Sequence, residues 1–67
     1  MLRIYALVDP RTGDVRYVGV TCCALWVRRN NHLHEARKSI ASCHRIRWLR
    51  QLISLDLRPE IWLLEET

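Results

Sequence analysis

The sequence lacks the apolar run of about 20 residues that a membrane-spanning helix requires. Its N-terminus also lacks the basic stretch, apolar core and small-residue cleavage site of a signal peptide. Its three cysteines are odd in number, and Cys22 and Cys23 are adjacent, a spacing at which two cysteines rarely bridge each other. These absences argue against a membrane protein and against a disulfide framework, so we expect a cytoplasmic protein.

The chain is also short, because its 67 residues allow one domain with a marginal core. Apolar residues make up 49% of it, which is too many for a disordered chain. Chains of this size often need a staple or a partner. An oligomer, or a further segment that completes the core, is therefore one expectation.

Lysine is nearly absent, since ten of the eleven basic residues are arginine. The formal net charge of the chain is +4. Arginine forms planar, forked contacts with phosphate, whereas lysine acts as a point charge. Between Arg28 and Arg50, seven basic residues stand against one acid, Glu35. This basic segment predicts a polyanionic partner, most often nucleic acid. A solvated helical surface explains the same charges, and charge alone does not decide between the two.

The local patterns predict an α/β (α+β) fold in the order β-β-α-α-β. Strands are expected over 2–8, 15–20 and 60–65, and helices over about 24–40 and 43–55, with Ser42 as the second N-cap. Pro10 and Gly13 favour a turn between the first two strands, and residues 56–59 break the second helix. We expect a small, three-stranded, mostly antiparallel sheet with both helices packed on it.

The first two strands each carry a tyrosine. If the loop runs from Asp9 to Gly13 and Val8 faces Asp14, Tyr5 lies opposite Tyr17 with both rings on one face. The pair could simply stabilise the hairpin, or it could present two phenols for chemistry.

Each expected helix has an apolar and a polar side. The apolar positions are Trp26, Leu33, Ala36 and Ile40 in the first helix and Ile46, Leu49, Leu52 and Ile53 in the second. Arg28, His32 and Glu35 share a face of the first helix that we expect at the edge of the core, where it can line a cleft. Arg45, Arg47 and Arg50 form the polar side of the second helix.

Soft metal ligands are present, but their spacing is unlike that of zinc sites. The six candidates are Cys22, Cys23, His32, His34, Cys43 and His44. Structural zinc sites usually take pairs of ligands from a single turn of the chain, such as CxxC, so we do not expect zinc. No recognised nucleophile motif surrounds the cysteines, and we do not expect cysteine catalysis.

The stretch "RIYALVDPRTGDVRYVGVT" resembles the signature of the GIY-YIG nucleases, two short tyrosine-containing strands joined by a turn. Arg3-Ile4-Tyr5 stands for the first element and Tyr17-Val18-Gly19 for the second. Arg28 and His32 match the family's helical arginine and the histidine or tyrosine that follows it, and "LRPEIWLLEET" resembles a later strand.

The resemblance implies hydrolysis of DNA phosphodiester bonds with one divalent cation, usually Mg²⁺. It implies that Tyr5 or Tyr17 orients or deprotonates the attacking water and that Arg28 holds the phosphate. His32 would position groups or transfer a proton, with a pKa near neutrality. Gly19 would allow close approach of backbone or DNA. The further residues expected at DNA are Arg29, Arg37, Lys38, Arg45, Arg47 and Arg50, and Arg29 rivals Arg28 for the arginine role.

The metal ligand stays unassigned. The family's metal-binding glutamate usually lies on a helix beyond the third strand, and we expect this chain, which reaches Thr67, to lack that helix. Three possibilities follow: a piece of a longer nuclease, a carboxylate recruited from a partner chain, or a module that binds DNA without cutting it. A different class, a small partner-binding protein with Trp48 or Trp62 exposed at an interface, also remains.

Overall fold

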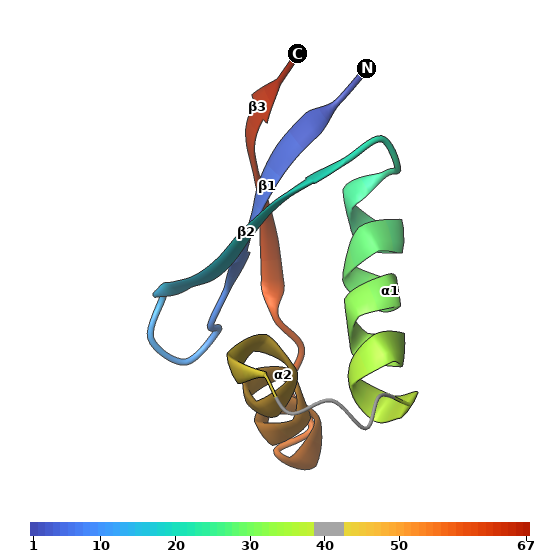
Figure 1. Ribbon diagram of the computed structural model, residues 1–67. Coiled ribbons are helices and arrows are strands. Elements are labelled where there is room, and N and C mark those ends of the chain that lie inside the picture. Colours follow the sequence, from blue (N-terminus) through green and yellow to red (C-terminus); the bar gives the residue numbers. More distant parts are fainter. Residues whose placement is uncertain (39–42) are drawn as a thin grey trace.

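Strand β1 (Arg3–Val8) lies at the centre of a three-stranded antiparallel sheet, in a computed structural model that describes residues 1–38 and 43–67 (Figure 1). The other elements are β2 (Val15–Thr21), α1 (Leu25–Lys38), α2 (His44–Ser54) and β3 (Glu60–Glu66). The sheet has the order β2-β1-β3, and both neighbours run antiparallel to β1. The predicted α+β class and element order are confirmed.

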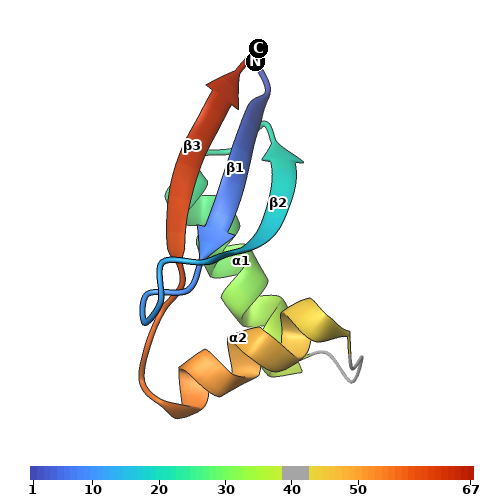
Figure 2. The same ribbon diagram turned by 90° about the vertical axis from the view of Figure 1, so that its left-hand side faces the viewer.

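One face of the sheet carries the core. Tyr5 and Leu7 project from β1 toward Leu33 of α1 and toward the apolar side of α2. Figure 2 shows the other face turned to the viewer, with α1 behind the strands and no described helix in front of them. Trp62 lies on β3 and is 46% exposed, so its predicted exposure is confirmed.

The turn between β1 and β2 is built around Asp9. The Asp9 carbonyl accepts the N–H of Gly13, whose φ of 78° lies in the left-handed region that favours glycine, and the Asp9 N–H donates to the Asp14 carbonyl. The Asp9 side chain is buried and accepts hydrogen bonds from Arg11. These bonds, with that of Trp48, hold the pKa of this carboxyl well below its usual range.

The predicted strand register is wrong. Val8 pairs with Val15, because the loop includes Asp14, and a register shift between Leu7 and Val8 adds a second displacement. Tyr5 therefore pairs with Gly19, and Tyr17 pairs with Leu7. The two tyrosines are diagonal neighbours on one face, where long side chains still reach each other.

Helix α1 buries only part of its predicted stripe. Leu33 and Ala36 are buried as predicted, but Trp26 is 63% exposed. Helix α2 lies beside the later turns of α1 and away from its first turn (Figure 1), and Trp26 is the second residue of α1. Ile40 lies outside the described residues. Within the described ranges, neither helix combines the length and the apolar character that crossing a bilayer demands.

Helix α2 follows Cys43 as its N-cap, one residue later than the predicted Ser42, which lies outside the described residues. Ile46, Leu49 and Leu52 are buried as predicted. The predicted exposure of Trp48 is wrong, because this side chain is only 4% exposed and its Nε1–H donates to the Asp9 carboxylate at 3.1 Å. Helix α2 is thereby tied to the hairpin turn.

Candidate functional site

Three aromatic rings meet where the inner face of the sheet touches α1. Tyr5 comes from β1, Tyr17 from β2 and His32 from α1. The ring centroids of Tyr17 and His32 are 5.3 Å apart, those of Tyr5 and His32 5.9 Å, and those of the two tyrosines 6.2 Å. Each ring therefore contacts the other two, although they come from three separate elements.

Arg28 and His32 are joined through one phenol. The Arg28 Nε–H donates to the Tyr5 hydroxyl at 3.1 Å, and that hydroxyl lies 2.7 Å from His32 Nε2. A hydroxyl can accept from arginine and still donate its single proton, so we assign Nε2 as the acceptor of a neutral imidazole. The three side chains then form one directed chain of hydrogen bonds from the guanidinium to the imidazole.

The site is electrostatically suited to a neutral His32. Burial, followed by the positive charges of Arg28 and Arg45, lowers the pKa of His32 to about 4. The expectation of a pKa near neutrality is therefore wrong. The hydrogen bond to Tyr5 raises the pKa of Arg28 above its usual value, so the guanidinium stays charged.

Gly19 makes room for both tyrosines. A Cβ at this position would lie 2.6 Å from the Tyr5 hydroxyl oxygen and 2.8 Å from Cε2 of Tyr17, closer than real contacts allow. The sequence suggested that Gly19 admits backbone or DNA, whereas in the structure the two phenol rings occupy that space. The glycine and the two tyrosines therefore form one packing unit.

Access to solvent divides the cluster. Tyr5 is fully buried and His32 is 1% exposed, so the expected position of His32 at the edge of the core is wrong. Tyr17 and Arg28 are partly exposed. The half-exposed pair can meet a ligand, while the buried pair lies behind it.

Arg45 and Glu35 extend the cluster toward α2. The Arg45 guanidinium lies 5.1 Å from the centre of the Tyr17 ring and pairs with the Glu35 carboxylate. Glu35 acts on the charge balance of both Arg28 and His32. A carboxylate is thus part of the surroundings of the cluster, on the helix that carries its arginine and histidine.

The other predicted DNA-binding residues are spread over the surface. Arg37 and Lys38 lie exposed in the last turn of α1, and Arg37 lines a separate cavity beside His34. Arg50 donates from Nε to the Ala36 carbonyl at 2.9 Å, and Arg47 is exposed on α2. The structure does not bring Arg37 to the cluster.

Arg28 and Arg29, the two candidates on α1 for the arginine role, differ in their contacts. Arg28 is the one that bonds to Tyr5, whereas Arg29 is partly exposed and its buried Nε makes no hydrogen bond within the described ranges.

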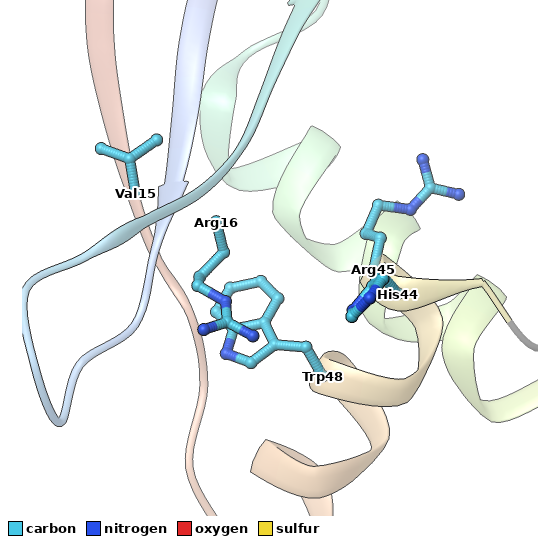
Figure 3. Close-up of a pocket in the computed structure, with 5 residues that line it drawn as sticks. All are labelled: Val15, Arg16, His44, Arg45 and Trp48. Carbon is cyan, nitrogen blue, oxygen red and sulfur yellow. The ribbon is translucent and has the colours of Figure 1, made fainter.

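A cavity of about 310 Å³ lies beside the cluster, between the start of β2 and the start of α2 (Figure 3). Its lining residues are Val15, Arg16, His44, Arg45 and Trp48. The sequence did not lead us to expect Arg16 or His44 at a binding site. The available signal for Arg16 was its position next to Tyr17 in the strand.

No metal cage is formed by the described residues, because 1–38 and 43–67 contain no group of three or more His, Cys, Asp or Glu side chains that could hold an ion. Cys22, Cys23 and Cys43 are free and exposed. Glu66 pairs with Arg3 at the far end of the sheet.

Comparison of the chain with protein-family models, curated proteins and solved structures gave no match. Fold and site together define an α+β domain with a tyrosine–histidine–arginine cluster where the sheet meets its first helix.

Proposed function

We propose that the chain is a GIY-YIG-type nuclease module that binds DNA and hydrolyses its phosphodiester bonds. The observation that carries the proposal is the meeting of Tyr5, Tyr17, Arg28 and His32 at one junction of sheet and helix. These four residues stand at the signature positions of the resemblance, and Tyr5 and Tyr17 also pack against Gly19, another of those positions.

Arg28 is the residue that would hold the phosphate. Its Nε is engaged by Tyr5, which fixes the plane of the guanidinium and leaves its terminal amino groups for phosphate oxygens. A preorganised cation of this kind stabilises charge that develops on the phosphate during hydrolysis. Tyr5 and His32, both buried, are positioning residues for that guanidinium.

Tyr17 is the phenol that would face the attacking water. Its ring is partly exposed, and its hydroxyl makes no hydrogen bond within residues 1–38 and 43–67. The hydroxyl oxygen can therefore accept a hydrogen bond from water and orient it toward a phosphate at Arg28. Exposure favours Tyr17 over Tyr5 for this proposed role, because Tyr5 is fully buried.

A divalent cation, as the resemblance implies, would neutralise phosphate charge and lower the pKa of a bound water. Mg²⁺ is often held by one or two carboxylates together with substrate phosphates. Glu35 fits this shared arrangement, since it is a half-exposed carboxylate whose charge acts on both Arg28 and His32.

Burial favours a second function, a module that binds DNA without cutting it. Tyr5 and His32 have almost no exposed surface, and the described residues form no carboxylate cluster. In such a module, the packing of the cluster holds Arg28 in position to bind a phosphate and has no catalytic role.

Plasmid nicking separates the two functions. Supercoiled DNA is incubated with Mg²⁺ and wild-type protein, Arg28→Lys or Arg37→Ala, and binding to a labelled duplex is measured in parallel in EDTA. We expect Arg28→Lys to keep most of its binding but to lose about 10²-fold or more in nicking rate, because it loses the fixed donor plane. Arg37→Ala removes a cation from the other side of α1 and should keep its nicking rate once DNA is saturating.

Binding that weakens with salt, without nicking by the wild type, would establish the binding module instead. Absence of both binding and nicking would overturn the two proposals together.

A further inference from the structure

The cavity of Figure 3 has the lining of an anion site. Five residues line it, and none of them is acidic. Arg16, the second residue of β2, and His44, the first residue of α2, line it from two elements. Its volume of about 310 Å³ is enough for a phosphate group.

Arg16 is held in place without being neutralised. Its guanidinium carbon lies 5.7 Å from the centre of the Trp48 ring, a cation–π distance. Within the described ranges, the side chains of Arg16 and His44 make no hydrogen bond or ion pair. A stacked guanidinium keeps its N–H edge available, and the imidazole of His44 adds a second donor.

The cavity excludes other kinds of ligand. Trp48 is 4% exposed and is covered by Arg16, so a nucleic-acid base has no free ring on which to stack. The absence of acidic lining residues argues against a cation. An acceptor-rich anion is the chemistry that remains.

Arg45 connects the cavity to the cluster. Arg45 lines the cavity, but Figure 3 shows its guanidinium directed away from Trp48. The Arg45 guanidinium lies over the Tyr17 ring. Contacts therefore run without a gap from Arg28 through Tyr5, His32 and Tyr17 to Arg45. Arg28 and the basic lining of the cavity lie at the two ends of this path.

We propose that the cavity is a second phosphate site, which holds a backbone phosphate of the same DNA strand that contacts Arg28. The proposal rests on DNA as the partner of the proposed function, but it does not depend on cleavage. Arg16 and His44 donate to the phosphate oxygens, and Arg45 lines the path between the two phosphates.

The three tryptophans allow a direct test. Indole N–H signals are followed by ¹⁵N NMR in EDTA, with Trp26→Phe and Trp62→Phe used for assignment, because both side chains are exposed. Inorganic phosphate and a short DNA duplex are titrated separately. We expect the Trp48 signal to move saturably with each ligand, because its ring lies under Arg16.

Arg16→Met keeps an aliphatic stem over Trp48 but removes the donors. We expect it to abolish the phosphate-dependent shift of Trp48 and to weaken duplex binding about tenfold, the loss typical of one charge-assisted contact. Arg58→Met, which removes the same charge beside a different cavity, is the matched control and should retain the Trp48 shift. A dispersed NMR spectrum of each variant establishes that it is folded.

A wild-type Trp48 signal that stays in place with both ligands would overturn the proposal, as would equal duplex affinities of the two variants. A shift with inorganic phosphate alone would reject DNA as the source of the phosphate. If the wild-type protein binds in this manner without nicking, only the nuclease function is lost. If it nicks DNA but Arg16→Met binds the duplex as tightly as the wild type, only the second site is lost.

Discussion

Gly19→Ala tests whether the cluster depends on a single missing side chain. The added Cβ would lie 2.6 Å from the Tyr5 hydroxyl oxygen and 2.8 Å from Tyr17 Cε2, so at least one ring must move. Overpacking of this kind costs about 1–3 kcal/mol, whereas replacing glycine also stabilises by about 0.4–1 kcal/mol through the unfolded chain. We expect a net loss of about 1 kcal/mol or more in the free energy of unfolding.

Urea unfolding followed by tryptophan fluorescence measures this loss, and NMR of the His32 ring reports whether the cluster is displaced. Tyr5→Phe supplies a second background, because it removes the oxygen that makes the shortest contact. The cost of Gly19→Ala should be smaller there, although a contact to Tyr5 Cζ at 2.8 Å remains.

Gly13→Ala is the control. A Cβ at Gly13 has no neighbour within 4 Å, but the φ of 78° is unfavourable for alanine, so its cost arises from the backbone and should be equal in both backgrounds. Wild-type stability of Gly19→Ala, with an unchanged His32 signal, would refute the packing argument.

Other substitutions test the remaining parts of the structure. Between pH 6.5 and about 4 the unfolded chain binds a proton at His32 that the folded chain does not. The free energy of unfolding should therefore fall by about 3 kcal/mol as pH decreases through this range. Urea titrations of wild type and His32→Gln over the same range measure this fall. Trp48→Phe should cost about 2 kcal/mol in urea unfolding by removing a hydrogen bond to a buried carboxylate, while the exposed Trp26→Phe should change stability by less than about 0.5 kcal/mol. Tyr17→Phe should abolish nicking with little change in stability, whereas Tyr5→Phe should lower stability by about 1–3 kcal/mol, because it strips a buried hydroxyl from two partners.

The hairpin shows which part of a strand pairing the sequence can determine. Alternation along each strand predicted that Tyr5 and Tyr17 share a face, because side chains repeat with a period of two. The exact partners depend on the loop and on the shift between Leu7 and Val8, which have no comparable periodicity. A displacement of two residues keeps the face and changes the partner, so the cluster was predictable and its pairing with Gly19 was not.

Burial was less predictable than element type. His32 shares a helix face with Arg28 and Glu35, and Trp48 directly follows Arg47, which favoured exposure for each. Each is buried because one distant partner satisfies its nitrogen, Tyr5 for His32 and Asp9 for Trp48. These partners lie in other elements of the fold, so no local sequence pattern predicts them.

Contacts made by side chains within the fold also limit how many basic residues of segment 28–50 can bind DNA phosphates. Seven basic residues between Arg28 and Arg50 would give a slope of about −6 for the logarithm of the association constant against the logarithm of salt, if each met a phosphate. The structure places Arg37 on another side of α1 and has Arg50 bonded to a backbone carbonyl. Three guanidinia, those of Arg16, Arg28 and Arg45, border the cluster and its cavity, so we expect a slope of about −3. Fluorescence anisotropy with a labelled duplex in EDTA, over a series of salt concentrations, measures this slope. A value near −6 would show that DNA is bound by the whole basic surface rather than by one path of phosphate sites.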